Sequence, residues 1–185
     1  MNIYGSKVIL RSMEPEDMDM LQEMINDPDI EGMVGGWSYP VSRYEQMKWY
    51  ESVVCDKQNL RFIIEEKNTR EALGMMGLME IDWKNRTAES AIKLKKDAPK
   101  RQGYATDAEF TLMQFAFESM QLHRLSAEIL EYNTASIALH EKCGARREGL
   151  KREAVFKKGK YHNVVCYGVF YEDFLKAAEK AGWSR

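Results

Sequence analysis

The chain has 185 residues, of which 44% are hydrophobic and 30% charged, and its formal net charge is −2. This length suits one domain with a substantial core, and no Pro-, Gly- or Ser-rich linker divides residues 1–185. No apolar run is long enough to cross a membrane, and the N-terminus shows no apolar signal segment. We therefore expect a globular cytoplasmic protein with no membrane partner.

The charges are divided unevenly along the chain. Residues 1–90 hold 10 Lys and Arg against 17 Asp and Glu, whereas residues 91–185 hold 17 against 12. The basic C-terminal half suits an anionic ligand, and the acidic N-terminal half suits a cationic one. Neither half is basic enough to predict nucleic acid as the primary ligand.

The cysteines and histidines predict no metal site and no disulfide framework. Three cysteines are widely spaced without a CxxC pair, and the three histidines have no metal-ligand spacing. Cys143 invites a nucleophile interpretation, but it lies one residue before a helix-ending glycine, and we expect a buried thiol there.

Hydrophobic periodicity predicts most of the secondary structure in chain order. A first strand (7–11) is followed by a helix that starts at 14–17 and is ended by Asp27-Pro28-Asp29. A glycine-containing loop then leads to a second helix (42–55). The elements expected after it are strands at 60–66, 72–83 and 88–94, a helix at 105–120, a strand at 123–130, a helix at 133–143, a terminal hairpin of strands at 145–156 and 161–170, and a helix from 171.

The stretch 93–144 organises the rest of the chain. Its strand-helix-strand order favours parallel pairing of the two strands. Gly103 lies where the first strand gives way to the helix, and free amides at a helix N-terminus suit a bound phosphate. We predict a pyrophosphate-binding turn with a basic surround, although a solvated basic turn would have the same sequence. The turn comprises Lys100, Arg101, Gln102, Gly103, Tyr104, Ala105 and Thr106, with Lys95 and Lys96 nearby.

A second motif follows the parallel strand. Asn133 is followed after six residues by His140, and then by Lys142 and Gly144 at alternate positions. Together with the Gly103-Tyr104-Ala105 turn, this pattern resembles the GNAT superfamily of acyl-CoA-dependent N-acyltransferases. The resemblance covers most of the chain and is strongest to the branch with the RimJ/RimL ribosomal-protein N-terminal acetyltransferases and the bacterial spermidine acetyltransferases. Further matching stretches are 7–11, 86–89, 147–149 and 159–163.

The resemblance implies a single GNAT N-acetyltransferase domain over residues 1–185 and acetyl-CoA as cosubstrate, with no metal. Its fold is of the α/β (α+β) class: a mixed, mostly antiparallel sheet with a splayed central parallel strand pair and helices on both faces. The chain departs from the family's turn pattern at Lys100, usually Arg or Gln, and at Arg101, often glycine in this branch. Asn133 is expected to contact the pantetheine arm, although a helix N-cap would also explain it.

Acyl transfer to an amine needs a base, a polarised thioester carbonyl and a proton for the leaving thiolate. Glu89 occupies the family's frequent glutamate position, and we predict that it accepts the amine proton through water; a partly exposed strand carboxylate is the alternative. A backbone N–H around Leu94 or Lys95 is expected to hold the thioester oxygen.

The sequence offers several candidates for the group that protonates the leaving thiolate. His140 stands where the family usually has a donor tyrosine, and an imidazolium could protonate a thiolate. The alternatives are that His140 only packs, that Ser136 takes over, or that Tyr104 or Tyr132 reaches in.

The loop after the first helix is expected to border the acceptor. The carboxylates of Asp27, Asp29 and Glu31 would attract a cationic amine, and Trp37 and Tyr39 would hold its carbon stem. A solvated acidic loop is the alternative. Methionines at 75, 76 and 79 could line the same site or simply pack in the core.

We therefore predict an acetyl-CoA-dependent N-acetyltransferase that acts by direct attack in a ternary complex. A protein N-terminal amine or a polyamine such as spermidine is the expected acceptor, and an amino sugar or an amine antibiotic is possible on the same fold. The alternative to an enzyme is a non-catalytic domain that binds CoA or has a regulatory role. The family also implies a possible homodimer.

Overall fold

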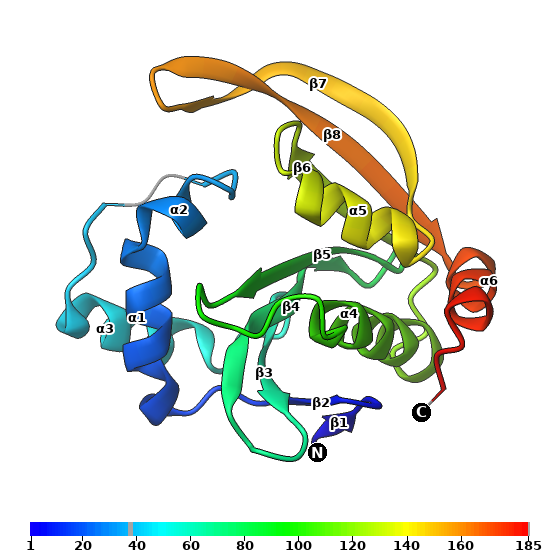
Figure 1. Ribbon diagram of the computed structural model, residues 1–185, viewed down its shortest axis with the longest axis horizontal. Helices are drawn as coiled ribbons and strands as arrows, with labels where there is room; N and C mark the ends of the chain where they lie inside the picture. The colour runs from blue at the N-terminus through cyan, green and yellow to red at the C-terminus, as the bar shows by residue number, and fades with distance from the viewer. Residues whose placement is uncertain (37–38, 185) are drawn as a thin grey trace.

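In the computed structural model, which describes residues 1–36 and 39–184, eight strands form one sheet in the order β1-β2-β3-β4-β5-β6-β8-β7 (Figure 1). The strands are β1 (Ile3–Tyr4), β2 (Val8–Arg11), β3 (Leu60–Glu66), β4 (Ala72–Asp82), β5 (Thr87–Leu94), β6 (Arg124–Leu130), β7 (Arg146–Lys157) and β8 (Lys160–Phe170). The α-helices are α1 (Met18–Asn26), α2 (Pro28–Glu31), α3 (Arg43–Val53), α4 (Tyr104–Gln114), α5 (Thr134–Lys142) and α6 (Tyr171–Ala181). A 3₁₀ turn (Pro15–Asp17) precedes α1, and a π-helical segment (Phe115–Ser119) continues α4. These bounds confirm the predicted mixed sheet with helices on both faces.

The middle of the sheet carries its one described parallel pair. β5 pairs with β6 from Thr87↔Arg124 to Glu89↔Ser126, and the ladder stops there. Beyond this point β5 stays on β4 as far as Leu94, while β6 stays on β8 as far as Leu130. The two central strands therefore diverge after Glu89, which confirms the predicted splay and opens the sheet between its two halves.

Alternating side chains divide the strands between two hydrophobic layers. Ile64 belongs to the larger core, which packs α4, α5 and α6 against one face of the sheet, whereas its neighbour Ile63 packs with α1 and α3 on the other. Along β5, Ala88, Ile92 and Leu94 join the larger core. Glu89 and Lys93 consequently share the opposite face, on which α1 and α3 lie.

The segment after α1 differs from the sequence prediction. Residues 27–29 were expected to end the first helix and lead into a loop, yet Pro28 lies in the first turn of the short helix α2. The Asp27 side chain caps this helix by accepting from the backbone N–H groups of Asp29 and Ile30. Proline is tolerated there because a first-turn N–H has no partner within the helix.

A buried carboxylate fixes the beginning of α4 to both ends of the chain. Asp107 is 3% exposed and accepts hydrogen bonds from the backbone N–H groups of Ser6 (3.1 Å), Lys7 (2.7 Å) and Val8 (2.9 Å). The Trp183 indole donates a fourth at 2.6 Å. This network sets the position of the α4 N-terminus on the sheet.

Candidate active site

The predicted phosphate turn lies at the N-terminus of α4 as expected. Gly103 is the N-cap residue with φ of +85°, and no described side chain caps the helix. The Asp107 N–H bonds to the Gly103 carbonyl, so the amides of residues 104–106 precede the first intrahelical bond. Arg101, placed where the family often has glycine, adopts φ of +61°. The backbone thus keeps a glycine-like shape despite the arginine.

The lysines that contact this turn differ in part from the predicted ones. Lys95 pairs with Glu71 at 2.6 Å, and Lys96 pairs with Asp29 at 2.8 Å and Asp27 at 3.4 Å, so both are engaged elsewhere. Lys7 instead donates to the Gln102 carbonyl at 2.6 Å.

Lys142 from α5 approaches the hydroxyl of Thr106 at 3.5 Å. Lys7 and Lys142 had no predicted role, because only the fold brings β2 and α5 to this turn. An open hollow of ≈ 510 Å³ beside the turn is lined by Ser6, Lys7, Glu66, Asn68, Arg101, Gln102 and Tyr104.

The backbone of β5 separates the two predicted oxyanion donors. The Lys95 N–H donates to the Leu73 carbonyl at 2.9 Å, inside the β4 side of the sheet. Because hydrogen-bonding direction alternates along an antiparallel strand, the Leu94 N–H faces the other side, toward the opening. The prediction for Lys95 is therefore wrong as a backbone donor, and Leu94 fits. The same alternation directs the Ile92 N–H into the opening, nearer to Glu89, a candidate that the sequence analysis missed.

Glu89 lies where the parallel ladder ends. Its side chain is half-buried and lies close to Glu128 of β6. Burial raises the pKa of Glu89, and the neighbouring carboxylates of Glu128 and Glu80 raise it further. A carboxyl with a raised pKa at the edge of an opening is a suitable proton acceptor.

His140 lies between α5 and the sheet and is 3% exposed. Its Nδ1 is 2.8 Å from the Ser136 carbonyl, which can only accept, so Nδ1 carries the proton. The Nε2 atom is buried with no described hydrogen-bond partner. In the neutral ring this nitrogen has no proton to give, and a second proton would leave a buried, unpaired imidazolium. The geometry favours the packing alternative over the acid role.

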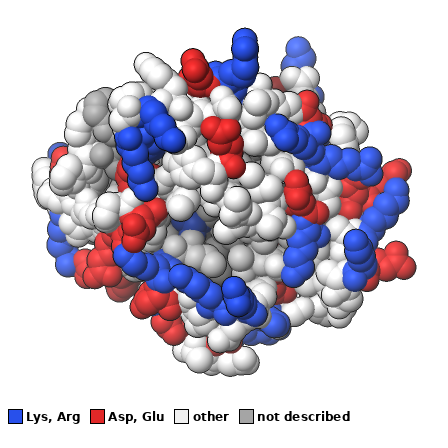
Figure 2. Space-filling model, turned by 45° about the horizontal axis from the view of Figure 1, so that its top comes forward, with Lys and Arg blue, Asp and Glu red and all other residues white. Residues whose placement is uncertain are grey.

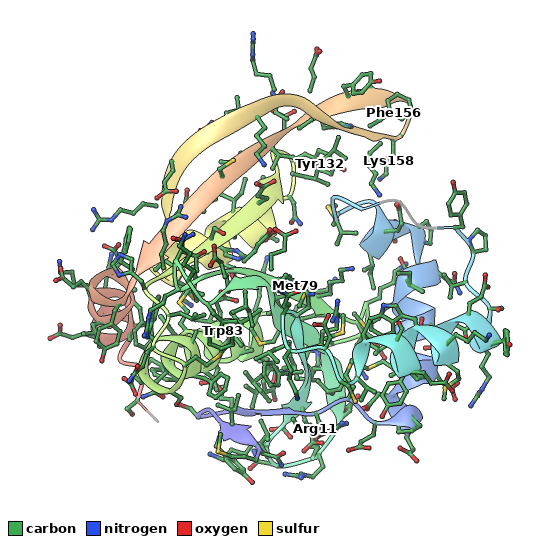
Figure 3. All side chains as sticks on the ribbon, turned by 180° about the vertical axis from the view of Figure 1, so that it is seen from behind. Arg11, Met79, Trp83, Tyr132, Phe156 and Lys158 are labelled. Atoms are coloured by element: carbon green, nitrogen blue, oxygen red, sulfur yellow. The ribbon has the colours of Figure 1, made fainter. Side chains whose placement is uncertain are left out.

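The other proton-donor alternatives lie in different places. Ser136 Oγ is 3.4 Å from His140 Nδ1, on the same turn of α5. Tyr104 lines the hollow beside the phosphate turn. Tyr132 lies beneath the β7–β8 hairpin and donates to the Gly32 carbonyl at 2.6 Å (Figure 3). Burial and Glu31 raise the pKa of Tyr132.

Asn133 has two structural duties in this conformation. Its Oδ1 caps α5 by accepting from the Ser136 N–H at 3.2 Å, and its Nδ2 donates to the Met33 carbonyl at 3.0 Å. The predicted N-cap is confirmed. The predicted contact with a pantetheine arm stays a prediction.

The predicted acidic lip is present, but its carboxylates are already paired. Asp27 and Asp29 share Lys96, and Glu31 pairs with Lys157 from the β7–β8 hairpin. Tyr39 is 64% exposed, and Trp37 lies outside the described residues. Lys158 also extends from the hairpin toward α2 (Figure 3), where its Nζ lies 3.1 Å from the position that a Gly32 Cβ would take.

The lysines make this side of the opening basic. Lys93 lies on the same face of β5 as Glu89, and its pKa is lowered by burial and by the nearby Lys157, with Glu31 opposing the shift. Lysine and arginine atoms are visible at the floor and along the rim of a hollow in Figure 2. Of the three methionines weighed for this site, Met76 belongs to the core on the α4 face, whereas Met75 packs with α1 and α3.

Three further observations concern metal-binding clusters, Cys143 and the length of the helices. Within residues 1–36 and 39–184, no cluster of His, Cys, Asp or Glu could hold a metal ion. Cys143 is fully buried, and burial raises the pKa of its thiol. The described helices are all too short or too polar to span a bilayer.

The comparisons with known proteins agree with this geometry. Residues 7–146 match the family model of the acetyltransferase (GNAT) domain. A prophage-derived uncharacterised N-acetyltransferase of Bacillus subtilis, YokL, is 28% identical over 92% of this chain and 93% of its own length. The spermidine N(1)-acetyltransferase of Vibrio cholerae is 25% identical over 95% of this chain and 99% of its own.

Solved structures show the same fold. The Vibrio cholerae spermidine N-acetyltransferase, in complex with CoA and spermine, superposes with a TM-score of 0.85 at 24% identity, covering 92% of this chain and 99% of that one. The family model covers the β5–α4–β6–α5 unit in which the splay and the uncapped helix N-terminus lie. The chain therefore belongs to the GNAT family of acetyltransferases.

Proposed function

We propose that this protein transfers the acetyl group of acetyl-CoA to a primary amine by direct attack within a ternary complex. The observation that carries the proposal is the divergence of β5 and β6 immediately after Glu89. It leaves strand amides and a carboxylate with a raised pKa at one opening, beside an uncapped helix N-terminus. These are the groups that thioester aminolysis needs.

Each part of the site has a separate task. The amides of residues 104–106, with Arg101 and Lys142 nearby, would hold the diphosphate. The Ile92 and Leu94 N–H groups would face the pantetheine arm and the thioester oxygen. Glu89 would take the amine proton directly or through water as the nitrogen attacks the carbonyl carbon. The tetrahedral intermediate then expels the CoA thiolate, which takes up a proton.

The relatives name two acceptor classes. Spermidine acetyltransferases of Vibrio cholerae and Escherichia coli are among them, as is a putative ribosomal N-acetyltransferase of Bacillus subtilis, YdaF. A protein N-terminal amine and a polyamine are therefore the two candidates. The lysines paired with the acidic lip weigh against the polyamine, because a polycation would have to displace Lys96 and Lys157.

The test is thiol release from acetyl-CoA with a panel of spermidine, amino sugars, aminoglycosides and peptides with free N-termini. Release with one class names the acceptor class. In Glu89→Gln, turnover should fall by about 10²- to 10⁴-fold while CoA binding stays unchanged. CoA binding without thiol release on any amine would favour the non-catalytic CoA-binding alternative.

A dodecameric structure is known for the Vibrio cholerae enzyme, and we propose that this protein also self-associates. Light scattering measures its mass in solution.

A further inference from the structure

The acceptor side of the opening contains more cations than its own acids can neutralise. Lys96 is shared by Asp27 and Asp29, and Lys157 is held by Glu31. Lys93 and Lys158 lie beside the same segment in addition.

Lys93, unlike the exposed Lys158, is a partly buried cation without a described partner. It is half-buried, and within residues 1–36 and 39–184 its Nζ makes no hydrogen bond or ion pair. Met75 pairs with it in register on β4, so its stem lies against apolar surface. A half-buried ammonium in such a place is costly unless an anion joins it.

Lys157 is a second ammonium group near Lys93, so it makes the burial of the Lys93 charge more costly. Its side chain is 7% exposed, and it donates to both the carboxylate and the backbone carbonyl of Glu31, the latter at 3.2 Å. The single carboxylate of Glu31 therefore faces two ammonium groups. Tyr132 and Asn133 hold the carbonyls of Gly32 and Met33, which fixes the segment that carries Glu31.

The other end of the same face has the opposite charge. Glu89 lies near Glu80 and Glu128, and only Lys151 opposes them in that group, through its ion pair with Glu128. Lys93 lies four positions after Glu89 along the extended strand, which is about 13 Å between Cα atoms. The site thus has an anionic end at the reacting amine and a cationic end along β5.

We propose that the acceptor is a primary amine bearing a carboxylate roughly 6–10 Å away, which binds between Lys93 and Lys157. This rests on the proposed function and names its substrate class. In such an acceptor the amine lies at the anionic end near Glu89 and the carboxylate at the cationic end near Lys93. A short peptide with an acidic group has both groups. A polyamine instead places its second ammonium against Lys93.

A matched series of amines tests the proposal. We compare 6-aminohexanoate, hexylamine and 1,6-diaminohexane, which differ in the group at the far end, using acetyl-CoA and wild-type protein. We expect kcat/KM about tenfold or more higher for 6-aminohexanoate than for hexylamine, with the diamine lowest. Lys93→Met should remove this advantage. Lys160→Met, which removes an exposed charge from the nearby β7–β8 hairpin, should keep it. A wild-type preference for the diamine or spermidine, or an unchanged ratio in Lys93→Met, would overturn the proposal.

A binding experiment separates this proposal from the proposed function. Thermal unfolding is measured with CoA, which carries no acetyl group to transfer, and with 6-aminohexanoate or 1,6-diaminohexane added. 6-Aminohexanoate should stabilise the wild type and Lys160→Met more than Lys93→Met, even if no amine in the series is acetylated; that lack of turnover would count against the proposed function alone. Because the two compounds share the amine end, stronger stabilisation by the diamine contradicts the cationic site directly.

Discussion

Replacing Asp107 by asparagine tests how the phosphate turn is held in place. Each oxygen of the buried carboxylate accepts two N–H groups: Oδ1 from Ser6 and Trp183, Oδ2 from Lys7 and Val8. Asparagine keeps the shape of the side chain but replaces one oxygen by an NH₂ group. The two N–H groups that bonded to that oxygen then face another donor and lose their acceptor. At roughly 1.5–3 kcal/mol for each hydrogen bond to a charged group, we expect a loss of about 3–5 kcal/mol. For a domain of this size the melting temperature should fall on the order of 10 °C.

Urea unfolding followed by far-UV circular dichroism measures this loss. Asp97→Asn is the matched control, because the Asp97 side chain is 80% exposed and its contact with Lys95 is 3.8 Å long. We expect that control to stay within about 0.5 kcal/mol of wild type. The double variant with Trp183→Phe should lose less than the sum of the two single variants, since both remove the same indole hydrogen bond. A loss below about 1 kcal/mol in Asp107→Asn would refute the reasoning.

Three further predictions concern catalysis and the turn. The base acts deprotonated, and burial followed by the neighbouring carboxylates raises the pKa of Glu89, so the acidic limb of kcat/KM should lie above the ordinary glutamate value of about 4.3. Glu128→Gln should move that limb down, and an unmoved limb in this variant contradicts the assignment. His140→Phe should keep turnover within about tenfold of wild type if the ring only packs, whereas loss of a general acid costs about 10²–10⁴ in kcat. Arg101→Gly should raise stability by about 1 kcal/mol, because the residue has φ of +61°, while weakening acetyl-CoA binding through loss of a cation; denaturation and KM measurements check the two effects separately.

Local patterns were sufficient where the physics is local. Strand β3 spans the predicted residues, and Ser42 caps α3 in a capping box with Glu45, which a serine three residues before a glutamate signals. The parallel pairing of β5 with β6 also followed from the strand-helix-strand order, whereas the splay was implied by the family resemblance. By contrast, α2 was missed because Pro28 reads equally as a helix end or a helix start, and four residues give no periodicity to decide.

The charges of the site could not be predicted in the same way. Asp29 and Lys96 are 67 residues apart, and Glu31 and Lys157 are 126 apart. Read along the chain, the acids of the lip indicated a cation-binding surface; in the fold, lysines from two other elements neutralise them. His140 is similar, since a motif position gives the residue type but neither the Nδ1 hydrogen bond that leaves Nε2 without a proton nor the burial of Nε2.

The network around Asp107 also has a consequence for the order in which the protein folds. Its donors come from residues 6–8 and from Trp183, and Ser6 Oγ donates to the Ser184 carbonyl at 2.6 Å. The Ser6–Asp107 and Asp107–Trp183 hydrogen bonds join residues 101 and 76 positions apart, and contacts that close such long loops form slowly. The α4 N-terminus is therefore fully fixed only after both distant segments have docked. In refolding, acetyl-CoA binding should appear later than formation of the sheet, and Trp183→Phe should delay binding more than it delays the sheet.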